Sequence, residues 1–212
     1  MRDLHGLYAI TGENPMRERT LTQRVAQAID GGARIIQYRD KASSQQQRLH
    51  ACLELKALCR TRGVRLIVND DIELAAACAA DGVHLGKDDD DPACARQRLG
   101  REAIIGLSCY DSWERAEMAH ALGVDYIAFG SFFPSQTKPA AVRANPDLLR
   151  RAHRELGMPT VAIGGITPEN GLLLIHAGAD MLAVVSGLFA QPDIRTSAQA
   201  YSNLFHAGGP TR

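Results

Sequence analysis

A short apolar run that ends abruptly on polar side chains, residues 64–71 (VRLIVNDD), is the feature that most constrains the fold. Its apolar part is rich in β-favouring residues and is typical of a strand buried on both faces of a parallel sheet. The run ends on Asn69, Asp70 and Asp71. In barrels of alternating strands and helices, the carboxyl ends of the strands carry the chemistry. The stretch therefore predicts a buried strand that delivers an amide and carboxylates to one rim of the sheet.

The same succession of strand, polar residues and helix repeats along the chain. Apolar runs predict strands at residues 4–11, 33–40, 64–71, 82–86, 103–109, 126–130, 160–165 and 181–187. Helical spacing, caps and glycine stops predict helices at residues 21–30, 44–62, 72–80, 92–99, 112–122, 147–156, from 167 onward, and 192–205. We predict an α/β fold, a parallel eight-stranded (β/α)8 TIM barrel. It forms one domain over residues 1–212, with a loose tail from about residue 207.

A doubly wound open sheet is the alternative architecture. To bind a dinucleotide it needs a G-x-G-x-x-G turn after the first strand, and residues 11–14 (TGEN) do not provide one. The barrel is therefore favoured. The longest predicted loop, residues 131–146, follows the sixth strand, and a loop of this length in a compact domain is usually functional or disordered.

Composition excludes several classes of partner. The 24 Lys and Arg residues balance the 24 Asp and Glu residues, so long-range attraction to nucleic acid or to an anionic membrane is not expected. The chain lacks an apolar stretch of membrane-spanning length, and its amino terminus does not have the pattern of a signal peptide. The five cysteines form no CxxC pair and are expected to be reduced, buried or half-buried thiols. We expect a cytoplasmic protein with small-molecule partners and leave open whether it forms a homo-oligomer.

If the strands end as predicted, the polar residues at their carboxyl ends meet in one mouth. The set comprises Gln37, Arg39, Lys41, Asn69, Asp70, Asp88 or Asp89, Ser108, Ser135, Thr137, Lys138, Gly164, Gly165, Ser186 and Gly187. This set combines carboxylates, cations and backbone-rich turns.

The carboxylates suggest a magnesium site. Mg²⁺ is commonly held by one or two carboxylates together with substrate phosphates. Asp70 and one Asp of residues 88–91 follow adjacent predicted strands and could share such an ion. The alternatives are that Asp70 caps the helix beginning at residue 72 and that the acidic run is a solvated loop capping the helix at Pro92.

The glycine turns and cations suggest phosphate sites. Residues 164–165 and 185–187 follow the last two strands, whose loops commonly hold a phosphate in barrels. Arg39, Lys41 and Lys138 add positive charge, with plain turn glycines and a surface salt-bridge pair as the alternatives. His84 is expected to be a packed histidine. A metal site and two phosphate sites without an evident base favour diphosphate departure assisted by charge.

At these residues the sequence resembles the thiamine-phosphate synthase (thiamine phosphate pyrophosphorylase) family. The family patterns match, in order, residues 37–41 (QYRDK), 69–70 (ND), 84–89 (HLGKDD), 106–108 (GLS), 130–139 (GSFFPSQTKP), 162–168 (AIGGITP) and 184–186 (VVS). The matches extend from about residue 7 to residue 189. Together they are highly specific, although each alone is weak.

The resemblance implies an alkyl transferase. The family joins a hydroxymethylpyrimidine diphosphate to a thiazole phosphate, which can be carboxylated, and releases pyrophosphate by a dissociative reaction assisted by one Mg²⁺ per site. It implies Asp70 and Asp89 as metal ligands and Arg39, Lys41, Ser108 and Lys138 as catalytic residues. The implied pyrimidine-diphosphate site is Gln37, Tyr38, Arg39, Asp40, Lys41, Asn69, Ser108 and Lys138. The implied thiazole-phosphate site is Ser135, Gln136, Thr137, Gly165, Val185 and Ser186.

Three positions depart from the family pattern. Ser135 stands where Thr is usual and keeps its hydroxyl, Asp71 adds a negative charge after the N-D pair, and Lys87 replaces Gln. Asp88 remains an alternative ligand to Asp89. Two other functions compete: a thiazole tautomerase on the same barrel, and a catalytically inactive regulator that binds thiamine phosphate. Joint retention of Lys41, Asn69, Asp70 and Lys138 argues against the tautomerase, and the presence of the metal ligands argues against the inactive regulator.

Overall fold

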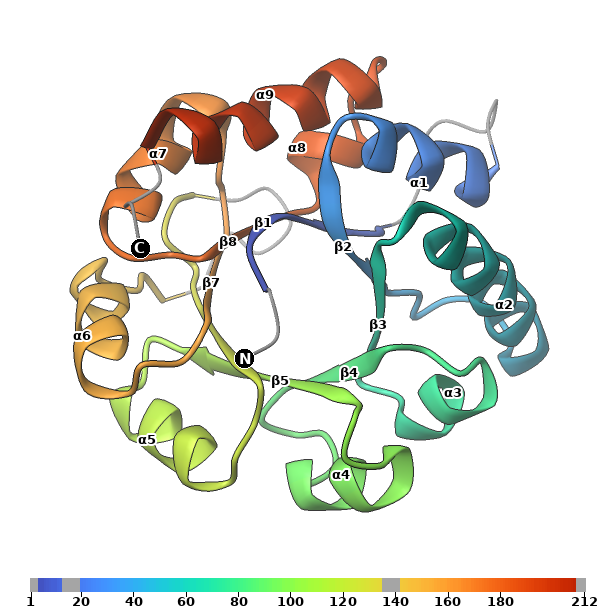
Figure 1. The fold of residues 1–212 in the computed structure, drawn as a ribbon, viewed down its shortest axis with the longest axis horizontal. Helices are drawn as coiled ribbons and strands as arrows, with labels where there is room; N and C mark the ends of the chain where they lie inside the picture. The colour runs from blue at the N-terminus through green and yellow to red at the C-terminus, as the bar shows by residue number, and fades with distance from the viewer. Residues whose placement is uncertain (1–3, 13–19, 135–141, 209–212) are drawn as a thin grey trace.

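Eight parallel strands form a closed barrel in which each strand pairs with the next and β8 pairs with β1. The computed structural model describes residues 4–12, 20–134 and 142–208. The strands are β1 (Gly6–Ile10), β2 (Ala33–Tyr38), β3 (Arg65–Asn69), β4 (Gly82–Leu85), β5 (Ile104–Tyr110), β6 (Tyr126–Phe129), β7 (Thr160–Ile163) and β8 (Met181–Val184). The ring of strands lies at the centre of the molecule and the helices surround it (Figure 1). The predicted (β/α)8 barrel is confirmed.

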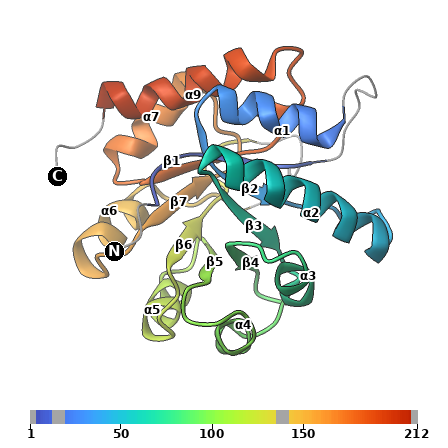
Figure 2. The same ribbon diagram turned by 45° about the vertical axis from the view of Figure 1, so that its right-hand side comes forward.

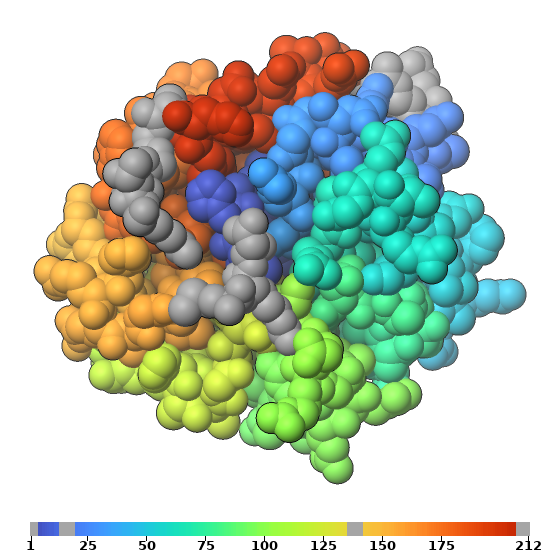
Figure 3. All heavy atoms as spheres, in the orientation of Figure 1, coloured from blue at the N-terminus to red at the C-terminus, as the bar shows by residue number. Residues whose placement is uncertain are grey.

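The helices form the outer layer. They are α1 (Leu21–Asp30), α2 (Gln45–Arg62), α3 (Ile72–Ala77), α4 (Pro92–Leu99), α5 (Trp113–Ala121), α6 (Asp147–Glu155), α7 (Pro168–His176), α8 (Ser186–Phe189) and α9 (Ile194–Gly208). The last helix, α9, packs against both α1 and α7 and so completes the outer ring (Figure 2). In the space-filling view the colours run around the molecule in chain order, from blue through green and orange to red (Figure 3).

Side-chain caps begin several helices at the predicted positions. Thr20 and Ser44 form capping boxes at α1 and α2, and the Asp91 carboxylate accepts a hydrogen bond from the Ala93 N–H at the start of α4, 2.7 Å away. At α3 the cap is Asp71, whose Oδ1 accepts a hydrogen bond from the Leu74 N–H at 2.8 Å. The alternative role of Asp70 as the cap of this helix is therefore wrong.

Two features near the carboxyl terminus differ from the prediction. The eighth strand ends at Val184, and Ser186 and Gly187 belong to the short helix α8 rather than to the strand. The last helix was predicted to end at residue 205, but α9 continues to Gly208; the rest of the predicted loose tail lies outside the described residues. Within the described part of the chain, no helix has the length and apolarity needed to cross a membrane.

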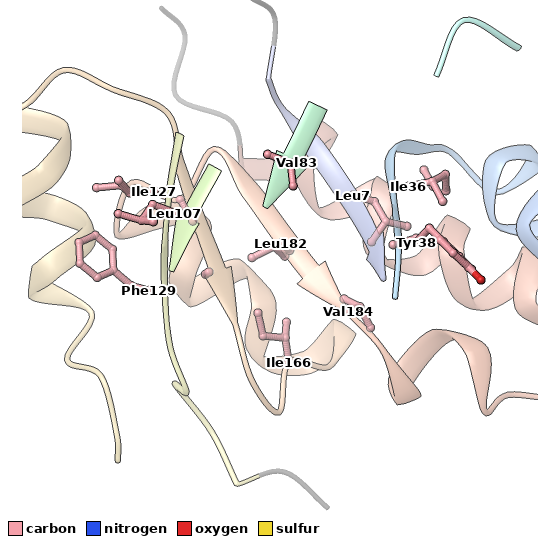
Figure 4. Close-up of a cluster of buried hydrophobic side chains, with 14 of the residues drawn as sticks. Leu7, Ile36, Tyr38, Val83, Leu107, Ile127, Phe129, Ile166, Leu182 and Val184 are labelled. Atoms are coloured by element: carbon pink, nitrogen blue, oxygen red, sulfur yellow. The ribbon is translucent and has the colours of Figure 1, made fainter. Parts of the chain in front are cut away.

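The alternation of side chains along each strand produces two apolar layers. Outward-pointing residues such as Leu7, Ile36 and Leu182 pack under the helices (Figure 4). Inward-pointing residues such as Ile67 and Met181 fill the barrel interior. The interior is thus a packed core, and the mouth at its carboxyl end is the remaining place for a ligand.

Polar side chains also point into this interior. Tyr8, Gln37, His84 and Tyr126 alternate with outward-facing residues on β1, β2, β4 and β6, and all are buried. Gly106 on β5 provides the space for Tyr126, because a Cβ at this position would overlap the tyrosine ring and its hydroxyl. The absence of a side chain at Gly106 therefore allows Tyr126 to reach across β5.

We expect Gly106→Ala to lower the free energy of unfolding by about 3 kcal/mol, because the rigid ring of Tyr126 must move. Gly123→Ala is the matched control: Gly123 has a positive φ of 67° but open space around its Cα, so strain alone should cost about 1 kcal/mol. Urea denaturation of both variants measures the difference. Equal losses would show that the ring can shift without cost.

Candidate active site

The end of β3 directs Asp70 into the mouth of the barrel. Asn69 is the last residue of β3, and Asp70 adopts a left-handed backbone conformation with φ of 64°. The Asp70 N–H donates to the His84 carbonyl at 2.9 Å, which ties this turn to β4. A non-glycine residue in this conformation is uncommon and is a frequent mark of functional turns.

Asp70 lies beside a cation and a second carboxylate. The Lys41 Nζ is 3.1 Å from the Asp70 Oδ2. Asp89 accepts a hydrogen bond from the Gly86 N–H at 2.6 Å and lies next to the Asp70 carboxyl group. Burial, and then the hydrogen bond with Asp70 and its negative charge, raise the pKa of Asp89 against the opposing effects of the Gly86 N–H and Lys41. The arrangement brings together residues that follow β2, β3 and β4.

This donor set fits a magnesium ion. Two adjacent carboxylates repel one another, and a divalent cation relieves the repulsion while leaving coordination positions for water and phosphate. Among the residues that the structure describes, no cluster of three or more His, Cys, Asp or Glu side chains could form a complete metal cage. A site of two carboxylates that shares its ion with a substrate is the kind that Mg²⁺ uses.

Asp71 does not add its charge to this pair. Its Oδ1 caps α3, and its Oδ2 lies 3.2 Å from the Arg48 Nη1 on α2. The extra negative charge of Asp71, which departs from the family pattern, is thus balanced by the N-terminus of α3 and by Arg48.

Gln37 and Tyr38, which were predicted to bind the pyrimidine diphosphate, lie on opposite sides of β2. Gln37 points into the barrel, whereas Tyr38 belongs to the outer layer, where its hydroxyl donates to the Asp40 Oδ2 at 3.4 Å. The other Asp40 oxygen accepts from the Ala42 and Ser43 N–H groups. The strand ends at Tyr38 rather than at the predicted residue 40, so strand alternation does not orient Arg39 and Lys41. The Arg39 backbone is instead held on both sides by the Thr11 hydroxyl.

A chain of hydrogen bonds crosses the interior below the mouth. The Gln37 Nε2 donates to the Tyr8 hydroxyl at 2.9 Å, and the Tyr8 and Tyr126 hydroxyl oxygens lie 2.8 Å apart. The Tyr126 hydroxyl is 2.9 Å from the His84 Nδ1, and the His84 Nε2 is 2.8 Å from the Ser108 Oγ. His84 is buried, so the expectation of a packed histidine is confirmed. Its connection to Ser108 was not expected.

Sequence reasoning missed Tyr8 and Tyr126. Both are central members of strands, where a tyrosine ordinarily indicates core packing. The available signal was their period-2 position: each is an inward-pointing polar residue in an otherwise apolar strand.

The turns after β7 and β8 form the opposite side of the mouth. Gly164 and Gly165 have positive φ values, and a Cβ at Gly165 would overlap the backbone of Phe133 and Pro134. The Phe133 N–H donates to the Gly164 carbonyl at 3.0 Å, so the segment after β6 lies directly against this turn. Val185 precedes α8 and Ser186 begins it. The predicted residues Ser135, Gln136, Thr137 and Lys138 lie outside the described residues.

A hollow at the amino-terminal end of the barrel does not offer comparable chemistry. Its lining includes Leu4, Val124 and Pro159, together with Asp125. Asp125 is already bonded to Arg96, with an oxygen 2.7 Å from the guanidinium. The mouth is therefore the candidate active site.

The fold and the site together define the class: a (β/α)8 barrel with a carboxylate pair and a lysine at the carboxyl ends of its strands. The family model "Thiamine monophosphate synthase" matches residues 7–188. The chain belongs to this family.

Curated relatives and a solved structure agree with the family assignment. The chain is 52% identical over 202 residues to the thiamine-phosphate synthase of Thiobacillus denitrificans, covering 95% of each chain. It is 50% identical over 202 residues to that of an Azoarcus species, covering 95% of this chain and 98% of the relative. The structure of thiamine phosphate pyrophosphorylase from Pyrococcus furiosus superposes with a TM-score of 0.85 at 31% identity, covering 95% of this chain and 96% of that one.

Because His84 is buried, we expect the folded state to lose stability in acid. Burial lowers the pKa of His84 to about 4, below the value of about 6.5 in an unfolded chain. The folded state therefore binds this proton less readily, and its contribution to stability is complete above pH 6.5 and is lost as the pH falls towards 4.

We expect this loss to reach roughly 3 kcal/mol. Urea denaturation between pH 7.5 and pH 4 measures it, with His84→Gln as the control that retains a polar side chain but does not titrate. The variant is expected to lose less stability over this range. Parallel curves for the two proteins would contradict the assignment.

Proposed function

We propose that this chain is a thiamine-phosphate synthase whose reaction takes place at the Lys41–Asp70–Asp89 cluster. It joins 4-amino-2-methyl-5-(diphosphooxymethyl)pyrimidine to 4-methyl-5-(2-phosphooxyethyl)thiazole, or to its carboxylated form. The observation that carries the proposal is the 3.1 Å pairing of Lys41 with Asp70, beside Asp89, in a chain that belongs to this family.

The proposed reaction separates bond breaking from bond making. The bond between the pyrimidine methylene carbon and the diphosphate oxygen breaks, and both electrons leave with pyrophosphate. The thiazole nitrogen then donates its lone pair to the methylene carbon and forms the new C–N bond. With the carboxylated thiazole, the bond to the carboxylate also breaks, CO2 leaves, and the ring carbon keeps the electron pair and takes up a proton. No proton has to be removed for these steps, which agrees with a mouth that is rich in charge and in which we assign no general base.

Mg²⁺ is the proposed cofactor, held by Asp70 and Asp89. When bound, it would neutralise charge on the diphosphate and so favour its departure. The Gly86 N–H holds the Asp89 carboxylate in place, and the Lys41 ammonium group balances the charge of the Asp70 carboxylate. We also assign Lys41 to the diphosphate itself.

The remaining assignments concern substrate binding. We assign the pyrimidine diphosphate to Gln37, Arg39, Lys41, Asn69, Ser108 and Lys138, with Tyr38 and Asp40 supporting the shape of the segment that carries them. We assign the thiazole phosphate to Ser135, Gln136, Thr137, Gly165, Val185 and Ser186. In barrels, the turns after the last two strands and a short extra helix commonly form a phosphate site. The helix α8 is short and follows β8 directly.

The same features weigh against the two alternatives. A thiazole tautomerase would bind a thiazole phosphate without needing a lysine and carboxylate pair for a diphosphate. The curated relatives at about 50% identity are thiamine-phosphate synthases. A regulator that only binds thiamine phosphate has no need for the carboxylate pair. The free cysteines, four of them buried, support our assignment of the enzyme to a reducing, cytoplasmic compartment.

Replacement of either proposed metal ligand should reduce turnover and change its dependence on magnesium. We expect Asp70→Asn and Asp89→Asn to lower kcat/KM about a hundredfold and to require more Mg²⁺ for half-maximal rate, because each removes one anionic ligand. Thiamine phosphate formation is measured over a titration of Mg²⁺, with EDTA as the zero point.

Asp88→Asn is the matched control, because it removes the same charge from the same acidic run. It is expected to retain the rate and magnesium dependence of the unaltered protein. If Asp88→Asn is impaired and Asp89→Asn is not, the second ligand is Asp88. Undiminished turnover in EDTA would remove the metal from the proposal.

Lys138 tests the assignment of the loop after β6. If its ammonium group stabilises the departing diphosphate, Lys138→Ala should lower kcat about a hundredfold and leave the KM for the thiazole phosphate within about threefold. Steady-state kinetics with each substrate varied in turn distinguish the two effects. A rise in the thiazole KM at constant kcat would instead place Lys138 at the other phosphate.

A further inference from the structure

The buried hydrogen-bond chain connects two residues assigned to the pyrimidine diphosphate. Gln37 stands at one end and Ser108 at the other, and Tyr8, Tyr126 and His84 lie between them, each at most 9% exposed. The side chains of Tyr8, Tyr126 and His84 hydrogen-bond to one another and to the two ends of this chain rather than to the proposed metal ligands, whereas the His84 backbone carbonyl accepts from the Asp70 N–H. Their arrangement therefore calls for a role of its own.

The number of available hydrogens gives the chain a direction. The Gln37 amide nitrogen can only donate, so the Tyr8 hydroxyl accepts from it and directs its own hydrogen to Tyr126. Tyr126 then accepts from Tyr8 and has one hydrogen left, which it donates to the His84 Nδ1. Burial raises the pKa of both tyrosines, so both phenols keep these hydrogens.

The direction determines which His84 nitrogen carries the proton. Both His84 ring nitrogens face hydroxyl groups in the buried interior, where a neutral ring with one proton is favoured over a charged ring. Because Nδ1 accepts from Tyr126, that proton is on Nε2 and is donated to the Ser108 Oγ. Ser108 then has its own hydroxyl hydrogen free to donate. In the opposite direction, Ser108 would spend this hydrogen on the His84 nitrogen.

Packing holds the hydrogen-bond chain in this geometry. The rings of His84 and Tyr126 are stacked with 5.6 Å between their centroids, and Tyr8 meets Tyr126 edge-on at 6.0 Å. Gly106 supplies the space that Tyr126 occupies between them. At the far end, the Arg115 Nε donates to the Ser108 carbonyl at 3.2 Å and fixes the serine backbone.

We propose that Tyr8, Tyr126 and His84 are positioning residues that hold His84 in its Nε2–H form, so that the Ser108 hydroxyl donates to an oxygen of the departing diphosphate. The inference rests on the proposed function in one respect, namely that Ser108 contacts the diphosphate. Diphosphate oxygens only accept hydrogen bonds, and their negative charge grows as the bond to carbon breaks. A serine that can donate therefore assists departure, whereas one that must accept does not.

The tautomer of His84 tests the direction without substrate. Long-range ¹H–¹⁵N correlation spectra of the histidine-labelled protein at pH 7.5 distinguish the two neutral forms, with His84 assigned through its backbone. We expect the Nε2–H pattern. An Nδ1–H pattern, or a doubly protonated ring, overturns the proposal.

Two variants connect the tautomer to the reaction. Tyr126→Phe removes the donor to Nδ1, and we expect the single Nε2–H pattern to be lost. Tyr201→Phe is the matched control: it removes another buried hydroxyl, which donates to the Ile166 carbonyl at 3.0 Å, and should leave the His84 spectrum unchanged. A unique Nε2–H pattern in Tyr126→Phe would show that Tyr126 does not set the tautomer.

A double-mutant cycle tests whether Tyr126 acts through Ser108. We expect Ser108→Ala to lower kcat about tenfold and Tyr126→Phe to lower it several-fold. The KM for the pyrimidine diphosphate should stay nearly unchanged in both variants. In the Tyr126→Phe protein, adding Ser108→Ala should cost less than its full effect, because the serine is already impaired. Fully multiplicative losses overturn the proposal.

The outcomes also separate this inference from the proposed function. An Nε2–H His84 in a protein that makes no thiamine phosphate supports the direction of the chain and refutes the function. An Nδ1–H His84 in an active synthase refutes the inference alone.

Discussion

The pairing of β8 with β1 closes the sheet, and the rest of the structure depends on this closure. A closed parallel barrel has no free edge and gives every strand residue one of two destinations, the interior or the layer under the helices. The interior admits little water. Each polar side chain that points inward must therefore find a partner there, since an unsatisfied buried group costs about 1–3 kcal/mol.

The hydrogen-bond chain from Gln37 to Ser108 is the consequence of that requirement. Five polar side chains from β1, β2, β4, β5 and β6 satisfy one another across the interior. The glycine at 106 is part of the same solution, because a larger residue would exclude Tyr126. The same residues thus pack the core and hydrogen-bond to Ser108, which we assign to the diphosphate.

Charge is organised locally rather than over the whole molecule. The chain carries equal numbers of acidic and basic residues, yet Lys41, Asp70 and Asp89 are concentrated where β2, β3 and β4 end. The neighbouring Asp71 is withdrawn to the start of α3 and to Arg48. This division leaves two carboxylates and one ammonium group facing the mouth, which is a donor set suited to a magnesium diphosphate.

The amino-acid sequence by itself determined the order of strands and helices, the barrel, and the gathering of Lys41, Asp70 and Asp89 where β2, β3 and β4 end. Local rules are sufficient for these, because apolar periodicity and capping residues act within a few positions; α1 and α4 begin and end where the pattern predicts. Only the tertiary structure decided that Asp71 rather than Asp70 caps α3, because that choice depends on the left-handed turn at Asp70. It also decided that Tyr8 and Tyr126, 118 residues apart, share a hydrogen bond, because barrel closure and the space at Gly106 bring them together.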